Sequence, residues 1–158
     1  MISEVSTPGG WAIKEVDILA RTVSSAVTAG DVVAVPAGAL VTAGMMTVGG
    51  GAATAAQRRT SIPGVALESA GIGAIYRLRI QGKCKALVKS TGNNAITRGA
   101  GLCYGTVKAL DADPPAVNTN RWVGRAVSEV AAGSSSTASL QDVVLYGLTG
   151  LGINATGT

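Results

Sequence analysis

The segment GVALESAGIGAIYRLRIQG, residues 64–82, has a counterpart in GRAVSEVAAGSSSTASLQDVVLYG, residues 124–147. Each begins with Gly-x-Ala, passes through a turn of small residues, and continues into an alternating strand that ends at glycine. A second matched pair lies upstream in the same order, AVTAGDVVAV at 26–35 and AITRGAGLCY at 95–104. This order indicates an internal duplication. Because one half alone would leave its apolar face uncovered, we expect the two halves to close on each other.

After Gly30, glycine interrupts the chain every few residues, and the runs between glycines are rich in Val and Ile. This pattern is typical of short strands joined by turns. The chain has no Phe and only 3% aromatic residues, so small aliphatic side chains must fill the core. Strands are expected at 31–37, 38–44, 64–69, 74–82, 83–90, 99–105, 122–130 and 139–147. The predicted fold is all-β, a compact barrel or sandwich of about eight short strands built from two similar halves.

The length of 158 residues fits one domain, which we divide into a β domain at 26–147, an N-terminal segment at 1–25 and a C-terminal tail at 148–158. The N-terminal segment is expected to be an extended arm, a short helix or a strand. Residues 9–27, GGWAIKEVDILARTVSSAV, hold the only helical period, and their β-branched content favours a strand almost equally. No run is apolar enough for a membrane span, and no signal peptide is recognisable. We therefore expect synthesis in a cytoplasm.

Residues 41–60, VTAGMMTVGGGAATAAQRRT, form an unusually long stretch of small residues between two predicted strands. Long loops without secondary structure are uncommon unless they bind something or stay mobile. Two interpretations stand: a surface loop, or an arm that orders against a partner. In the second, Met45 and Met46 would supply adaptable apolar contacts, with Arg58 and Arg59 at the base.

Positive charge is concentrated in YRLRIQGKCKALVKS, residues 76–90, where the cations occupy odd positions and most apolar residues occupy even ones. The cations are Arg77, Arg79, Lys83, Lys85 and Lys89. In an extended chain this alternation places them on one face, provided that Gly82 does not turn the chain. Outside this segment eight cations face nine acids, so the formal charge of +4 originates here.

Three interpretations of this basic face remain open. It is a solvated outer strand face whose lysines discourage sheet-to-sheet aggregation, a docking face for an acidic protein shell, or a nucleic-acid site. The last lacks stacking aromatics and a recognition motif, so no sequence-specific nucleic-acid binding is expected.

The order of these motifs resembles the head decoration, or capsid cement, proteins of tailed phages. The similarity spans roughly residues 27–147, from AVTAGDVV through GVALESA and AITRGAGLCYG to VGRAVSEVAAG and VVLYG. The resemblance implies a β-rich virion protein that binds the outer surface of a shell of major capsid protein. It also implies a homo-oligomer, with a trimer favoured, that stabilises contacts between capsomers and does not bind membranes. The insertion at 41–60 departs from the family pattern.

Catalytic chemistry is not indicated. The chain has no histidine and no nucleophile-elbow, phosphate-loop or dinucleotide motif, so we expect neither an enzyme nor a cofactor. Cys84 and Cys103 lack metal-ligand spacing and are expected to be reduced and half-buried. The two carboxylates of DADPP, residues 111–115, fit a turn better than a metal site.

The alternative function is a ligand- or glycan-binding β domain on a phage particle or a cell surface. Such a site needs aromatic side chains that converge on loops. Trp11 and Trp122 lie instead beside a terminus and at a strand start. We expect Trp122 in the core, and Trp11 either in the core or at a subunit contact.

Overall fold

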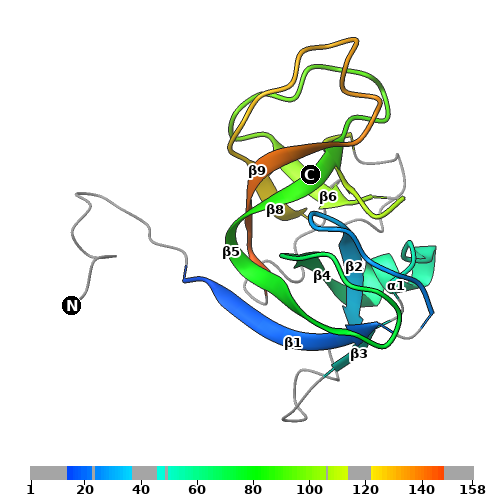
Figure 1. The fold of residues 1–158 in the computed structure, drawn as a ribbon. Coiled ribbons are helices and arrows are strands. Elements are labelled where there is room, and N and C mark those ends of the chain that lie inside the picture. Colours follow the sequence, from blue (N-terminus) through cyan, green and yellow to red (C-terminus); the bar gives the residue numbers. More distant parts are fainter. Residues whose placement is uncertain are drawn as a thin grey trace.

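The computed structural model describes residues 14–22, 24–36, 46–48, 50–105, 107–113 and 122–147. These residues form nine strands and one short helix (Figure 1). The elements are β1 (Val16–Thr22), β2 (Val32–Pro36), β3 (Met46–Val48), α1 (Ala55–Thr60), β4 (Ser61–Ala66), β5 (Ile75–Lys89), β6 (Gly101–Tyr104), β7 (Leu110–Asp111), β8 (Trp122–Ala126) and β9 (Ser139–Leu145).

Five of the strands close into a barrel in the order β5, β7, β6, β8, β9. The ring closes because β9 pairs with both β8 and β5. The barrel is mixed, since β5 and β7 run parallel while the other pairs are antiparallel. The predicted all-β class and barrel are therefore confirmed.

The first part of the chain repeats this arrangement. We call β1–β4 with residues 75–81 of β5 the first set, and residues 83–89 of β5 with β6–β9 the second set. In both sets the first strand is antiparallel to the fifth and parallel to the third. β6 pairs with β7, whereas β2 and β3 are not paired among the residues that the structure describes. Figure 1 shows the second set above the first, with β5 running through both.

Equivalent residues are paired in the same register in the two sets. Val33 lies opposite Gly64 in the β2–β4 pair, and Leu102 lies opposite Gly124 in the β6–β8 pair. Gly64 and Gly124 open the two segments that the sequence matched. The predicted duplication is thus present as repeated strand pairing.

The turns before β2 and β6 also match. The N–H of Gly30 donates to the C=O of Ala66 at 2.8 Å, and the N–H of Gly99 donates to the C=O of Ala126 at 2.7 Å. Both glycines have positive φ, +95° and +84°, a region that side-chain-bearing residues rarely adopt. The matching glycines of the two sequence segments therefore form the same kind of turn in both sets.

The repeat extends further than the sequence showed, because β1 corresponds to the second part of β5. Arg77 and Asp142 occupy matching positions, since each carbonyl accepts a hydrogen bond from the residue that follows β4 or β8. Opposite them lie Leu19 of β1 and Lys85 of β5. Within the stretch considered for a helix, residues 16–22 are therefore a strand, because β1 pairs with β5 from Val16 to Arg21.

β5 is one strand of 15 residues rather than the two predicted strands at 74–82 and 83–90. Its side chains alternate between outward and buried positions on both sides of Gly82, so the predicted cations all lie on the outward side, together with Ile75 and Leu87. Gly82 has a φ of +97°, and a Cβ added there would lie 2.9 Å from the Cα of Glu15. The strand therefore continues through Gly82 from the first set into the second without reversing direction.

Two clusters of buried side chains form the core. One lies in the first set and includes Ile62, Tyr76 and Leu78. The other is built mainly from the second set and includes Leu102 and Leu145. The second cluster also contains Val32, Ala53 and Val65 from the first part of the chain. The two sets are therefore packed together rather than merely tethered.

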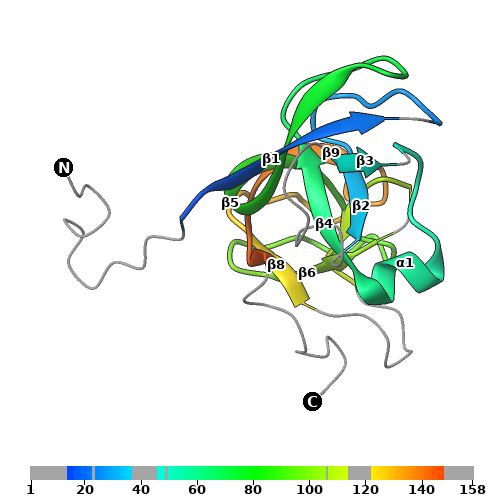
Figure 2. The same ribbon diagram turned by 90° about the horizontal axis from the view of Figure 1, so that it is seen from below.

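The stretch 41–60 contains more structure than predicted. β3 pairs with β1, and α1 packs beside β2 and β4 (Figure 2). α1 begins at a capping box in which Thr54 and Gln57 exchange side-chain and backbone hydrogen bonds, which compensates for its short length. The predicted strand at 38–44 lies outside the described residues. No helix in the described part of the chain is long and apolar enough to cross a membrane.

Candidate binding surface

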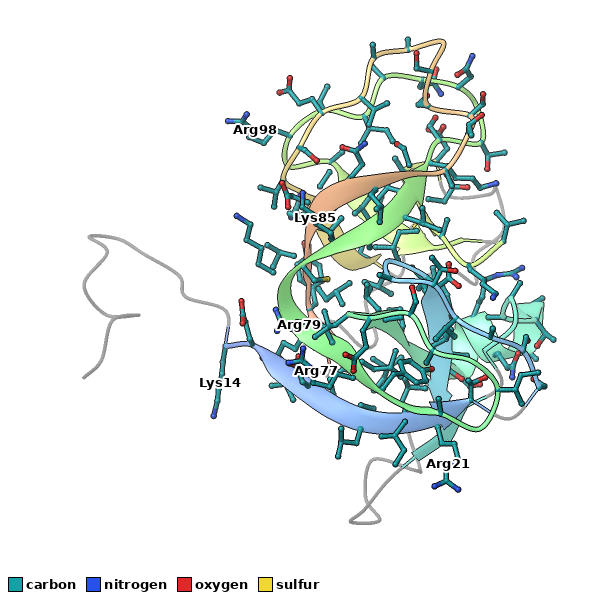
Figure 3. All side chains as sticks on the ribbon, in the orientation of Figure 1. Lys14, Arg21, Arg77, Arg79, Lys85 and Arg98 are labelled. Atoms are coloured by element: carbon teal, nitrogen blue, oxygen red, sulfur yellow. The ribbon has the colours of Figure 1, made fainter. Side chains whose placement is uncertain are left out.

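The outer face of β5 carries the predicted basic residues. Alternation along the strand turns their side chains away from the core, and Figure 3 shows Arg77, Arg79 and Lys85 following the outside of the strand. The sequence therefore placed these cations on the correct face. It did not show which side chains stand beside them.

Arg79 lies between two acids from the segment that leads into β1 and from β1 itself. Its Nε is 2.6 Å from Oδ1 of Asp17, its Nη1 is 3.2 Å from Oε2 of Glu15, and Nη1 also donates to the C=O of Lys83 at 2.5 Å. Only 14% of the side chain is exposed. The hydrogen bond to Asp17 raises the pKa of the Arg79 guanidinium further above its ordinary value. Arg79 is thus a positioned structural residue rather than a free docking charge.

Three of the other cations also have acidic neighbours from adjacent strands or loops. Arg77 Nε lies 3.8 Å from Oε1 of Glu68, and Lys85 Nζ lies 3.3 Å from Oδ1 of Asp142. Lys89 Nζ lies 3.9 Å from Oδ2 of the buried carboxylate of Asp111. The exposed pairs contribute little to stability, because water and salt screen them. They do neutralise the surface.

The predicted basic face is therefore electrically balanced. Five acids, Glu15, Asp17, Glu68, Asp111 and Asp142, stand beside four of its five cations, which makes the number of acids equal to the number of cations. Of the 13 cations and nine acids in the chain, removing these five and five leaves eight cations and four acids elsewhere. The net charge of +4 consequently lies away from this face. Counting charge along one segment missed acids that only strand pairing brings near.

Four exposed cations, one on β5 and three elsewhere, form no ion pair within the described residues. Lys83 is exposed on β5 and forms no ion pair within the described ranges. Lys14, Arg21 and Arg98 are likewise exposed and unpaired among the residues described. Figure 3 shows Arg21 at the lower end of the molecule, Arg98 in its upper part and Lys14 at the start of β1, so these cations are spread over the surface rather than gathered on one face.

Three of the other predicted contact residues lie in β3 and α1 rather than on β5. Met46 begins β3, and Arg58 lies in α1, where its Nη1 donates to the C=O of Ala53 at 2.7 Å. Arg59 follows in the same helix. Met45 and Trp11 lie outside the described residues. These five residues stay predictions as contacts.

The two carboxylates of the DADPP segment fasten the loop at residues 90–94. Asp111 accepts hydrogen bonds from the N–H and the hydroxyl of Thr91, and Asp113 accepts them from the hydroxyl of Ser90 and the N–H of Gly92. No group of acidic, cysteine or histidine side chains suited to a metal ion occurs in the described part of the chain. The segment predicted to be a turn therefore holds the loop at residues 90–94 in place through its two carboxylates.

The carboxylate of Asp113 should make the stability of the protein depend on pH in the acidic range. The hydroxyl of Ser90 lowers the pKa of Asp113 below its ordinary value, so its contribution to stability is complete above the unfolded value and is lost as pH falls through the folded value. We expect Asp113→Asn to be less stable than the wild type at about pH 6 and closer to it at about pH 2.5, by urea unfolding. A stability difference of equal size at both pH values would contradict this role.

The remaining features offer little space or reactivity. Cys84 and Cys103 are free and buried, and burial raises the pKa of each thiol to about 12, which keeps them unreactive. Among the cavities between described residues, one of about 200 Å³ is lined by Ser24, Gly50 and Gln57, and another of about 200 Å³ by Gly30 and Leu140. Ligand sites usually exceed this volume, at roughly 300–1,000 Å³.

Comparison with known proteins supports the fold. No family model matches the chain, and no curated protein matches it in sequence. A solved structure does match, that of the head fiber gp8.5 N base in bacteriophage phi29. The identity is 17%, the TM-score is 0.51, and the match covers 84% of this chain and 94% of that one. At this identity the likeness shows a shared fold, and membership of the decoration protein family stays a prediction.

Proposed function

We propose that this chain is a structural protein of a tailed-phage particle, held on the outer surface of the capsid, where it stabilises contacts between capsomers. The observation that carries the proposal is the fold shared with the head fiber base of bacteriophage phi29 over most of both chains. The order of sequence motifs supports the same class independently, since it resembles capsid decoration proteins. A fold can host several functions, so the surface chemistry must also fit.

The surface fits a contact role rather than catalysis. The chain has no histidine. The carboxylates that the structure places near the cations are engaged in ion pairs or loop hydrogen bonds, so they hold the fold and do not converge on a cavity. These ion pairs and hydrogen bonds agree with a non-enzymatic role.

For the capsid-facing surface we propose the outer face of β5, together with the segment from Met45 to Arg59 and the residues at both ends of the chain. On the outer face of β5, positive side chains stand beside negative ones from neighbouring segments. Lys83 is the cation of this face that forms no ion pair within the described residues. Such a pattern orients a partner and excludes wrong ones more than it adds affinity. The shell should therefore present acids near Lys83.

Reversing charge on this face should weaken capsid binding. The double variant Arg77→Glu, Lys85→Glu leaves Glu68 and Asp142 beside new acids, so the balanced face becomes negative. We expect capsid occupancy to fall about tenfold or more, with a larger loss at low salt, while the free protein keeps its fold. Binding to undecorated capsids of the phage that encodes the chain, followed by co-sedimentation, measures this.

The matched control exchanges one ion pair, Arg77→Glu with Glu68→Arg, which preserves the net charge of the face. It should retain much more binding than the double reversal. Full occupancy by the double reversal would exclude β5 as the capsid-facing surface. Failure of the wild-type chain to bind the capsid at all would exclude the proposed function.

A further inference from the structure

A small cavity opens where the two strand sets meet, beside the outer face of β5. Its volume is about 200 Å³, and its lining residues are Ala29, Gly30, Ala66, Leu67, Lys85 and Leu140. Residues 29–67 belong to the part of the chain that holds β2 and β4, whereas Lys85 lies on β5 and Leu140 on β9. We call this cavity the seam notch. Because the side chain of Lys85 points outward, the seam notch is continuous with the outer face of β5.

The walls of the seam notch are fixed by contacts between and within the two sets. The N–H of Leu87 in β5 donates to the C=O of Gly30 at 2.9 Å, and the N–H of Ala66 donates to the C=O of Asp31 at 2.9 Å. The side chain of Leu140 packs beside Gly30, since a Cβ added to that glycine would lie 2.2 Å from Cδ2 of Leu140. The seam notch is therefore part of the folded framework and is formed before any partner arrives.

The lining of the seam notch is mainly aliphatic. Apart from Lys85, its lining residues are Ala, Gly and Leu, and Leu140 is 51% exposed. None of these residues is aromatic, so the seam notch offers no ring on which a sugar or a base could stack. Its volume is small for a ligand site, but an apolar cavity of about 150 Å³ already holds a benzene molecule. The seam notch therefore fits one aliphatic side chain of a protein partner.

Ion pairs stand near the seam notch on both strand sets. On the second set, Lys85 Nζ lies 3.3 Å from Oδ1 of Asp142. On the first set, the backbone N–H of Leu67 donates to the C=O of Arg77 at 3.0 Å, and Arg77 is paired with Glu68, the residue after Leu67. Figure 3 shows Arg77 and Lys85 along the same side of β5. An apolar centre with a polar rim is the usual anatomy of a protein–protein interface, whose binding energy concentrates at the centre.

The charge beside the seam notch indicates what else the partner carries. Lys83 precedes Lys85 by two residues on the outer face of β5, which places the two about 7 Å apart along the strand. Lys83 is exposed and forms no ion pair within the described ranges, and Lys85 keeps 68% of its side chain exposed beside Asp142. A carboxylate complements this position. In an extended partner segment, side chains two residues apart share one face at the same spacing.

We propose that the seam notch receives an aliphatic side chain of the major capsid protein, with a carboxylate of the same segment beside Lys83. This inference rests on the proposed function and names the chemistry that the capsid-facing surface recognises. The aliphatic side chain supplies most of the affinity, because it leaves water for an apolar cavity. The charged groups around it set the orientation of the partner. A nucleic acid or a glycan would not meet both requirements.

Filling the seam notch should weaken capsid binding. Ala29 is exposed, and its hydrogen bond to Oγ of Ser69 at 3.0 Å uses only its backbone N–H, so Ala29→Trp should keep the fold while it occupies the notch. We expect affinity for undecorated capsids to fall about tenfold or more at both about 0.05 M and 0.5 M salt, because salt does not screen an apolar contact. The matched control is Ala132→Trp, the same change at an exposed alanine in a loop of the second set, which should bind as the wild type does.

Crosslinking on the particle identifies the segment that fills the notch. A photoreactive group attached to Ala29→Cys should capture a stretch of the major capsid protein that holds an aliphatic and an acidic residue, and the same group on Ala132→Cys should not, with buried Cys84 and Cys103 remaining silent. Wild-type affinity in a folded Ala29→Trp variant, or equal capture from both positions, would overturn the seam notch as the docking site and leave the proposed function standing. Failure of the wild type to bind capsids would overturn both.

Discussion

Gly124→Ala is expected to lower the free energy of unfolding by about 3 kcal/mol, because the close approach of β8 to β9 leaves no room for a methyl group. A Cβ at Gly124 would lie 2.4 Å from the backbone C=O oxygen of Val144, and a backbone atom in a paired strand cannot move aside easily. Urea unfolding followed by circular dichroism measures the change.

Two matched glycines serve as controls for this prediction. At Gly64, the equivalent position in the first set, a Cβ would meet side-chain atoms of Val35 at 2.8 Å and Leu78 at 3.4 Å, so Gly64→Ala should cost less, about 1 kcal/mol. At Gly71 a Cβ would meet no atom within 4 Å among the described residues, so Gly71→Ala should be nearly neutral. A larger loss at Gly64 than at Gly124 would contradict the packing argument.

Leu78→Ala is expected to destabilise the whole chain by about 2–5 kcal/mol, although Leu78 belongs to the core cluster of the first set. Leu78 is fully buried and lies on β5, the strand that both sets share. Val32, Ala53 and Val65 also reach into the second cluster. The chain should therefore unfold in one cooperative transition, as expected for a single domain.

Fluorescence of Trp122 tests this cooperativity, because Trp122 reports on the second set. In a Trp11→Phe background it is the remaining tryptophan, and its unfolding curve should coincide with that from circular dichroism in both the parent and Leu78→Ala. Ile72→Ala, at a residue 65% exposed, should change stability by less than about 0.5 kcal/mol. A Trp122 transition that stays in place while the circular dichroism transition shifts would show two independent units.

Much of the fold was accessible from the sequence. The spacing of glycines and β-branched residues predicted β2, β6, β8 and β9 within a few residues. The matched segments at Gly64 and Gly124 revealed the duplication. β3 and β7 were missed because strands of three and two residues carry no readable period. β1 was left open because its alternation and its spacing fit two kinds of element.

Less of the candidate surface than of the fold could be predicted from the sequence. Alternation identified the outward side of β5 and its cations, a local property of an extended chain. Their neutralisation by Asp17, Glu68 and Asp142 could not be foreseen, because these acids stand up to 62 residues away in the chain. Nor could the sequence show that Gly30 is buried while the matching Gly99 is exposed, since the two local sequences are alike.

By itself, therefore, the sequence determined the all-β class, the twofold repetition and the side of each strand that faces outward, because these follow from side-chain periodicity and from where glycine permits positive φ. Only the tertiary structure decided the charge of the outer face and which copy of a repeated surface remains uncovered. Charge balance and exposure depend on which strands become neighbours, and that is settled by long-range packing rather than by local pattern.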